Sequence, residues 1–458
     1  MKYTIAILFP VWLTAQVAAD DFLSRKDLAI TEDTTLAKAL ARYAVPYDGP
    51  SNSSYVDPST LTGKVMAGYQ GWFRCEGDGA GQGWVHWGHN GRFDNDHCSI
   101  DFWPDVSEYD EDEKFRTPFQ YKDGAPAYVF SSYKRKTVFR HFQWMKQYGI
   151  DGVFPQRFQS VTIGRDMNRT AKQIAGLGVL SHVRDAANYH GRTYAVMYDC
   201  SFGKQDWDRL LHDWKILHTE MQLTQDPVYL KHNGKPVVAF WGYLFGHRRF
   251  DLKATREAFE LLRTDPDYGP ATILLGIDSR WSQPNFEGSG VLTGKVKREY
   301  YEMADILLPW KVAERDQSEI EMSRIRYARD LQWCKKRSIE YFPVISPGFS
   351  WHNLKQHEPG HEAYSASEYA PRRNGELLAE KFTAVKKAGA RQAYVAMFDE
   401  VDEGTAIFKC SVNHPISDRQ IFVPYRVPSD HYLRMTADGG RLLRGEMSLD
   451  DFRKRYVK

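Results

Sequence analysis

The stretch QAYVAMFDEVDEG (392–404) places four acids, Asp399, Glu400, Asp402 and Glu403, directly after an apolar run of strand length. Like charges at this spacing repel one another, and every carboxylate that leaves water loses solvation free energy. An apolar strand that runs into four acids therefore predicts a site with a chemical task, either catalysis or metal binding. Two simpler interpretations stand beside it: a solvated loop, and the start of a helix, whose positive end favours acids.

Seven other runs have similar length and apolar character. Together with 392–400 they make eight predicted strands, the others being 64–72, 149–158, 193–201, 235–242, 271–278, 304–310 and 341–349. Near-continuous apolar strands that alternate with helices are typical of parallel sheets buried on both faces. Eight such units predict an α/β fold, a single (β/α)8 TIM-type barrel whose catalytic face lies at the C-terminal ends of the strands.

Apolar residues at helical spacing predict helices between these strands. The helix-like stretches are 132–148, 167–190, 206–222, 256–264, 319–337 and 373–389. Gly149 and Gly389 fall just after two of them, where a left-handed cap belongs. The alternative fold is a doubly wound open sheet with a glycine-rich phosphate turn after its first strand. Gly77, Gly79 and Gly81 follow the first strand, but no helix opens straight after them, so a nucleotide site is not favoured.

Composition and the chain ends narrow the class of protein. A formal net charge of +2 does not favour a nucleic-acid partner. Lys2, the apolar stretch after it and the small residues at 17–19 predict a signal peptide, and hence a secreted or periplasmic protein. No later segment reaches the roughly 18 apolar residues that span a bilayer. The oligomeric state is left open. The expected parts are a signal peptide at 1–19, a leader at 20–60, the barrel at 61–424 and a tail packed on it at 425–458.

The chain has five cysteines, and export permits disulfides. Cys75 and Cys98 bracket one loop, so we expect them to pair. Cys200 and Cys410 follow strand-like runs, and we expect them to be buried packing residues. The odd count leaves at least one free thiol.

Aromatic and polar side chains gather at the predicted C-terminal strand ends, where a barrel enzyme works. Aromatic rings stack on the C–H faces of sugars, while acids and amides bind sugar hydroxyls, so this mixture predicts a carbohydrate site. The residues expected to bind substrate are Tyr69, Trp72, Tyr198, Asp278, Trp351 and His352.

The loop after the first strand also holds three histidines beside acids: His86, His89 and His97. Their spacing matches no common zinc motif, and two glycines argue against a helix that would align them. We therefore interpret this segment as a polar substrate loop, and expect neither a metal nor another cofactor.

Three segments carry a resemblance to a known group of enzymes: GYQGWF (68–73), PVISPGFSWHNL (343–354) and EVDEG (400–404). They resemble the glycoside hydrolase family 99 and family 71 group, including its bacterial "71/99-like" members, over roughly 60–420. The resemblance implies a (β/α)8 barrel and an endo-acting α-mannosidase that retains configuration without a metal.

By the same resemblance, EVDEG corresponds to the family motif that carries two catalytic glutamates. Glu400 is then the base that removes the proton of the substrate's own 2-hydroxyl, which attacks C1 to form a 1,2-anhydro sugar. Glu403 is the general acid and base. Val401 and Asp402 stand where the family 99 motif has Trp-His, which puts the mannose specificity in question.

The sequence therefore predicts an exported, retaining glycoside hydrolase that acts on an α-linked polysaccharide or glycan, with an α-mannan favoured. A glycan-binding barrel at the cell surface that does not cut its ligand is the alternative from another class. A calcium-assisted site at Asp399 and Asp402 is a third possibility.

Overall fold

The computed structural model describes residues 20–165, 170–200, 206–243, 245, 251–283, 294–356, 370–417, 419–420 and 422–457. The expected signal peptide at 1–19 lies outside these residues. No helix among the described residues is long and apolar enough to cross a membrane.

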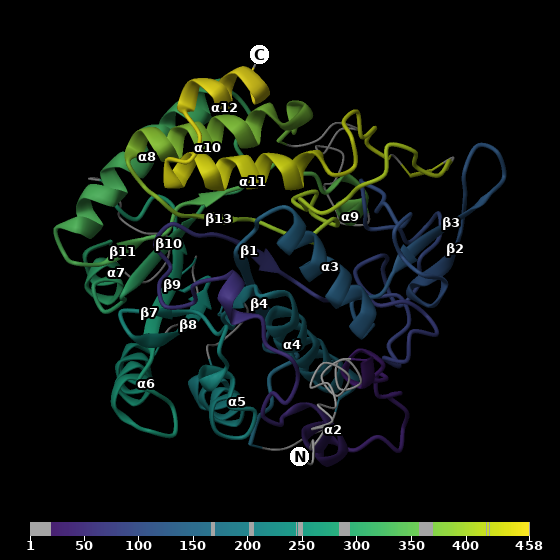
Figure 1. The fold of residues 1–458 in the computed structure, drawn as a ribbon, viewed down its shortest axis with the longest axis horizontal. Coiled ribbons are helices and arrows are strands. Elements are labelled where there is room, and N and C mark those ends of the chain that lie inside the picture. Colours follow the sequence, from purple (N-terminus) through teal and green to yellow (C-terminus); the bar gives the residue numbers. More distant parts are fainter. Residues whose placement is uncertain are drawn as a thin grey trace, which may run out of the picture.

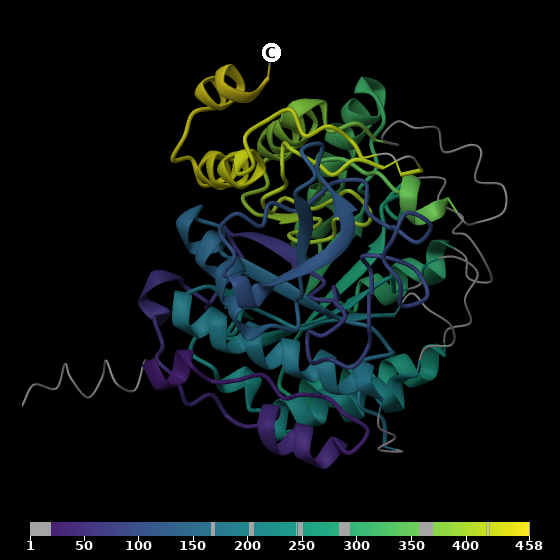
Figure 2. The ribbon, with the colours of Figure 1, turned by 90° about the vertical axis from the view of Figure 1, so that its right-hand side faces the viewer.

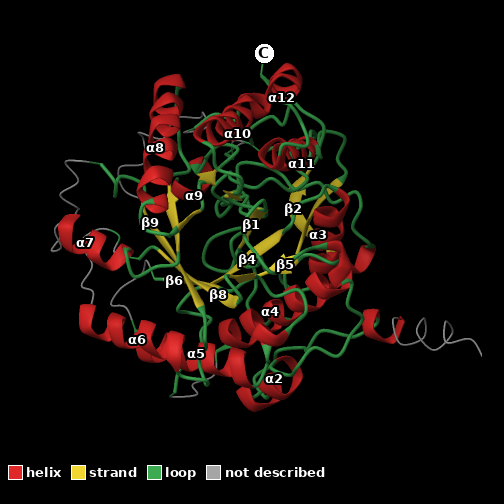
Figure 3. Ribbon diagram, turned by 60° about the vertical axis from the view of Figure 1, so that its left-hand side comes forward, coloured by secondary structure: helices red, strands yellow, loops and turns green. Residues whose placement is uncertain are grey.

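Parallel strands form a ring at the centre of the molecule, with helices around it (Figure 3). Their order in the sheet is β11-β10-β9-β8-β6-β4-β1-β13-β12. The strands are β1 (Val65–Tyr69), β4 (Gly152–Arg157), β5 (Thr193–Tyr194), β6 (Met197–Asp199), β8 (Lys235–Trp241), β9 (Thr272–Asp278), β10 (Ile306–Trp310), β11 (Glu340–Tyr341), β12 (Val344–Ile345) and β13 (Ala393–Val395). Each of the eight predicted runs contains at least one of them.

One segment closes the ring. β11 pairs with β10, and β12 pairs with β13 on the other side. Between these two short strands, Phe342 N donates to Leu307 O, and Tyr394 N donates to Pro343 O, both at 2.9 Å. β11 and β12 are thus two halves of a single strand position. The predicted (β/α)8 barrel is confirmed.

The barrel interior is a packed core rather than a channel. Rings from three strand positions meet there: Phe154 lies 6.0 Å from Phe342 and 5.8 Å from Tyr394 between ring centroids. All three side chains are buried. This filling is typical of barrels of eight strands, and it leaves the ends of the strands as the place for a site.

Helices cover the outside of the ring (Figure 1). They are α3 (Arg135–Gln147), α4 (Ala171–His190), α5 (Trp207–Thr219), α6 (Leu252–Thr264), α7 (Gly294–Tyr301), α8 (Gln317–Lys335), α9 (His352–Lys355) and α10 (Glu376–Ala388). Short 3-10 turns lie at Ser53–Tyr55, Glu111–Glu113, Leu223–Gln225 and Arg373–Gly375. Gly389 ends α10 with a φ of 88°, and Gly149 follows α3 with a φ of 64°, as their positions predict. The sequence pattern did not reveal α7 and α9.

Both ends of the described chain pack on this helical layer (Figure 2). α2 (Leu36–Tyr43) contacts α4, while α11 (His431–Arg444) and α12 (Leu449–Tyr456) contact α10 on the opposite side. α11 approaches closely because Gly439 has no side chain: a Cβ there would lie 2.4 Å from the ring of Phe382.

A long insertion between β1 and α3 was not predicted. It contains an antiparallel hairpin, β2 (Lys114–Gln120) and β3 (Pro126–Phe130), beside the barrel (Figure 1). Buried tryptophans anchor it, because Trp87 Nε1 donates to Phe130 O at 2.9 Å. A short β-bridge, with Arg74 and Val85 exchanging 3.1 Å hydrogen bonds, brings both ends of one loop together. β7 (Lys231–His232) forms a second small hairpin with β8.

The expected disulfide between Cys75 and Cys98 is wrong. All five cysteines are free and buried. The Cys75 thiol donates to Phe130 O at 3.2 Å, and burial raises its pKa well above the ordinary value. Cys200 and Cys410 are buried packing residues, as predicted.

Candidate active site

The acids after β13 do not start a helix, since residues 405–409 are not helical. Asp399 is fully buried, and its carboxylate accepts hydrogen bonds from the backbone N–H groups of Gln70 and Gly71, both at 2.8 Å. Burial raises the pKa of Asp399 to about 7, and these two hydrogen bonds oppose the rise. Asp399 therefore ties the end of β13 to the end of β1 and supports the acids that follow.

Glu400 follows Asp399 in the chain and lines a cavity. Its Oε1 accepts from Gln70 Nε2 at 2.8 Å, and its Oε2 accepts from Thr405 Oγ1 at 3.0 Å. Burial raises the pKa of Glu400 well above the ordinary value, and the negative charges of Glu403 and Asp402 raise it further. The two hydrogen bonds act in the other direction, because they favour the ionised carboxylate.

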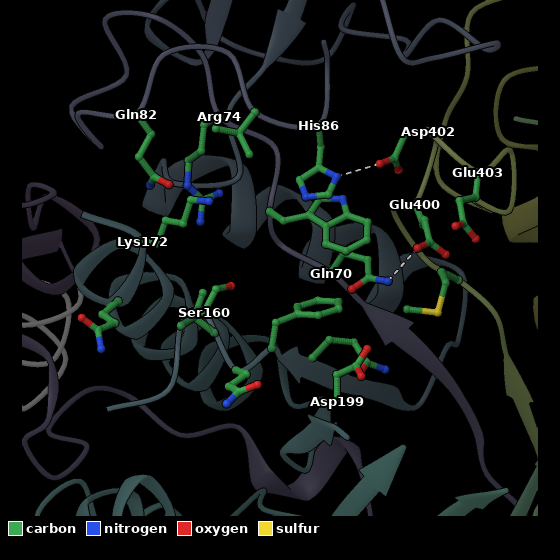
Figure 4. A pocket seen from close by; sticks show the side chains of 18 of the residues that line it. Gln70, Arg74, Gln82, His86, Ser160, Lys172, Asp199, Glu400, Asp402 and Glu403 are labelled. Carbon is green, nitrogen blue, oxygen red and sulfur yellow. Dashed lines mark hydrogen bonds and ion pairs between the residues drawn. The ribbon is translucent and has the colours of Figure 1, made fainter. Parts of the chain in front are cut away.

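Glu403 is the more accessible of the two glutamates. Burial raises its pKa to about 7, the nearby charge of Asp402 adds to the rise, and Lys355 opposes it. A carboxyl group with such a pKa keeps a proton near neutral pH, which suits a general acid. Figure 4 shows Glu400, Asp402 and Glu403 gathered on one side of a cavity.

Asp402 contacts a side chain of the loop after β1. It is 2% exposed, and its Oδ2 accepts from His86 Nδ1 at 2.8 Å. Its Oδ1 is buried and has no hydrogen-bond partner among the described residues. Asp402 and Asp399 thus have separate partners, and the structure does not bring them together as a calcium site.

His86 belongs to a stack of three rings. Its ring lies 3.7 Å from that of Trp72 at an interplanar angle of 3°, and Trp72 lies 5.1 Å from Phe158 at 30°. His86 has a φ of 63°, a left-handed backbone that is uncommon outside glycine. The loop therefore holds His86 in an unusual conformation, between Trp72 and Asp402.

A cavity of about 1260 Å³ opens at the C-terminal ends of the strands. Several strands contribute side chains to its wall next to the acids, namely Gln70, Gln156, Asp199, Trp241 and Trp310. Barrel enzymes have their active sites at this face, so the cavity is the candidate active site.

Of the six side chains expected to bind substrate, Trp72 lines this cavity. Its ring lies between His86 and Phe158, so it presents an edge rather than a free stacking face. Asp278 hydrogen-bonds with Arg280 and is not part of the wall. Trp351 and His352 are half-buried at the start of α9, whose Leu354 lines the cavity instead.

Tyr69 and Tyr198 require a correction, because both are fully buried. Tyr69 hydrogen-bonds with His141 of α3 at 2.9 Å, and Tyr198 donates to Asp213 of α5 at 2.8 Å. Successive side chains of a strand point to opposite faces. The tyrosines point outward to the helices, and the residue that follows each of them, Gln70 or Asp199, lines the cavity.

The three histidines of the first loop do not converge. His86 contacts Asp402, His97 Nδ1 lies 2.7 Å from Asp94 Oδ1, and His89 Nε2 lies 3.3 Å from Ser99 Oγ. The sequence did not predict the contact between His86 and Asp402. The histidines mark this loop in the sequence, but no local sequence pattern connects the loop to the acids.

Comparison with known proteins gives a fold. No protein-family model and no curated protein matches this chain in sequence. The structure of the GH99 endo-α-mannosidase from Bacteroides thetaiotaomicron matches with a TM-score of 0.57 and 16% identity, over 86% of this chain and 99% of that chain. The structure of that enzyme in complex with bis-Tris propane gives a TM-score of 0.58 and 14% identity over the same shares. The resemblance stated from sequence is confirmed at the level of the fold.

Proposed function

We propose that this protein is a glycoside hydrolase that cleaves an α-linked polysaccharide or glycan with retention of configuration, after export from the cytoplasm. One observation carries the proposal: two glutamates with raised pKa values, the buried Glu400 and the half-buried Glu403, meet at one end of a large cavity. Glycoside hydrolysis normally uses a pair of carboxyl groups, one of which must hold a proton.

The roles follow the resemblance. Glu403 protonates the leaving glycosidic oxygen, while Glu400 takes the proton of the 2-hydroxyl and the 2-oxygen attacks C1. In the second step Glu403 removes a proton from water, which opens the 1,2-anhydro ring at C1. Glu400 returns its proton to the 2-oxygen. Two inversions at C1 leave the configuration unchanged.

The hydrogen bonds of Glu400 and the position of Glu403 support this division. The hydrogen bonds from Gln70 and Thr405 favour the ionised form of Glu400, which a base needs. Once Glu400 is ionised, its negative charge disfavours ionisation of Glu403, so the acid keeps its proton. Glu403 has its raised pKa and access to the cavity, which are what an acid requires.

The substrate is proposed to be an oligosaccharide or polymer rather than one sugar. Small-molecule pockets usually measure about 300–1,000 Å³, and this cavity measures about 1260 Å³. Trp241 and Trp310 offer apolar rings, and Gln156 and Asp199 offer polar groups for hydroxyls. The fold likeness to an endo-α-mannosidase favours an α-mannan.

Reducing-sugar release tests the proposal. Wild type, Glu400→Gln and Glu403→Gln are incubated with α-mannans, α-glucans and N-glycans, with Glu32→Gln as a control on the exposed surface. We expect one substrate class to be cut by wild type and the control, and by neither site variant. If Glu403→Gln keeps full activity, the assignment is wrong. If a polymer binds all four proteins equally and none cuts it, a glycan-binding barrel replaces the hydrolase.

A further inference from the structure

The cavity has a second end whose chemistry differs from that of the acids. Arg74, Gln82 and Lys172 gather on one side of His86, while Glu400, Asp402 and Glu403 lie on the other (Figure 4). Arg209 also lines the cavity and belongs to this end: its NH1 donates to Thr162 O, which also accepts from Gln173, the neighbour of Lys172. We call Arg74, Gln82, Lys172 and Arg209 the basic end.

Arg74 is the centre of the basic end and is 5% exposed. Its NH1 donates to Gly71 O at 2.8 Å and to Phe73 O at 3.0 Å, which anchors the guanidinium. Its Nε is buried and has no hydrogen-bond partner among the described residues. A buried guanidinium with an unused donor carries a desolvation cost that an anion would offset.

Two other buried arginines have a carboxylate partner in direct contact. Arg157 pairs with Asp213 at 2.5 Å, and Arg135 pairs with Asp185 at 3.0 Å. The carboxylate that acts on Arg74 is Asp78, which accepts hydrogen bonds from Cys75 N, Ala80 N and Ser131 Oγ. Its charge opposes the lowering of the Arg74 pKa by burial without contacting the guanidinium.

The unsatisfied groups of the basic end are all donors. Gln82 Nε2 and Arg74 Nε are buried without partners among the described residues, and so is Nε1 of Trp72 in the adjoining ring stack. At the acid end, by contrast, Gln70 Oε1 and Asp402 Oδ1 are unsatisfied acceptors. A neutral sugar hydroxyl can pair with a donor or with an acceptor. Unsatisfied donors alone are complementary to an oxyanion, which accepts several hydrogen bonds.

We propose that the basic end binds an anionic group carried by the glycan substrate: a sulfate ester, a phosphate or a uronate carboxylate. The proposal rests on the proposed function, because it names a substrate class for the same cavity. The anion lies across the stack of Trp72, His86 and Phe158 from the glutamates, so it belongs to a sugar other than the one that is cleaved. The planar guanidinium of arginine forms bidentate hydrogen bonds with oxyanions of this kind.

Binding measurements test the inference independently of cleavage. The probes are one yeast α-mannan in four forms: unmodified, sulfated, phosphorylated, and oxidised to the carboxylate at C6. Affinity is measured by gel electrophoresis in the polymer with Glu403→Gln, which keeps the basic end. We expect at least one anionic form to bind about tenfold or more tightly than the neutral parent, the factor typical of one charge-assisted hydrogen bond. The preferred form identifies the anion.

Two substitutions, each combined with Glu403→Gln, test whether the basic end causes the preference for an anionic polymer, and a third substitution is the control. Arg74→Gln and Lys172→Gln are expected to reduce it, while Lys38→Gln on the exposed face of α2 changes the net charge equally and keeps it. If Arg74→Gln does not fold, as judged by circular dichroism, the exposed Lys172 decides. Equal affinity for all four polymers overturns the inference, and so does a preference that both variants retain.

The two proposals fail in different ways. If wild type cuts the neutral polymer and no anionic form binds better, the hydrolase stands and the inference falls. If an anionic form binds better through Arg74 and Lys172 but no form is cut, the inference stands and the hydrolase falls.

Discussion

Replacing Glu403 by glutamine should raise stability and abolish activity together. The folded protein raises the pKa of Glu403 from 4.5 to about 7, so ionising this group costs the fold about 3 kcal/mol at most. Exposure of Glu403 to the cavity reduces this figure, to about 1–3 kcal/mol. Glutamine has no proton to lose and avoids the cost.

The sign of the effect depends on pH. Below about pH 4 the proton is bound in both the folded and unfolded chain, and the variant gains nothing. Between pH 4.5 and 7 the unfolded wild type ionises more readily than the folded one, so wild-type stability falls. Above pH 7 the full difference in unfolding free energy between the variant and the wild type is present. Unfolding entropy for 458 residues corresponds to about 1 kcal/mol per degree, so we expect a Tm gain of about 1–3 °C.

Differential scanning fluorimetry at pH 4 and pH 8.5 measures this gain, beside reducing-sugar release. Glu32→Gln is the matched control, because its carboxyl is exposed. Activity should fall about 10²–10⁴-fold, the usual contribution of a general acid. A Tm difference that does not change with pH, or a variant that stays active, would refute the reasoning.

Three further predictions concern the pH dependence of activity, a buried ion pair and the cysteines. Wild-type activity should fall as pH rises through about 7, where Glu403 loses its proton. Asp402→Asn should move this decline to lower pH in initial-rate profiles, because the variant lacks the negative charge that raises the pKa of Glu403. A decline that stays at the same pH argues against Glu403 as the acid. Asp213→Asn leaves Arg157 buried without its ion pair. The loss of stability should be about 3–5 kcal/mol, seen as a lower Tm in a thermal melt. A drop in Tm below 1 °C would contradict the claim that this ion pair stabilises the fold. Reducing agent should leave the Tm unchanged because all five cysteines are free; a shift above 2 °C would indicate a disulfide.

Local pattern was enough to predict the barrel. Each strand is a short apolar run buried on both faces, and each of the six predicted helices carries apolar residues at helical spacing, so both periodicities are visible without knowing any contact. The hairpin of β2 and β3 was not predicted, because Pro118 interrupts β2 and a proline within a run argues against a strand. The acids after β13 were also visible locally, because four charges follow one buried strand.

The sequence by itself thus determined the fold class and the position of the acids along the chain. Only the tertiary structure decided which side chains share the cavity. A shift of one residue along a strand reverses the face of a side chain, which separates Gln70 from Tyr69 and Asp199 from Tyr198. His86 and Asp402 are 316 positions apart, and their hydrogen bond exists because the loop after β1 folds over the end of β13. Trp72 stacks on His86 in the same way, although neither ring is near the acids in the sequence.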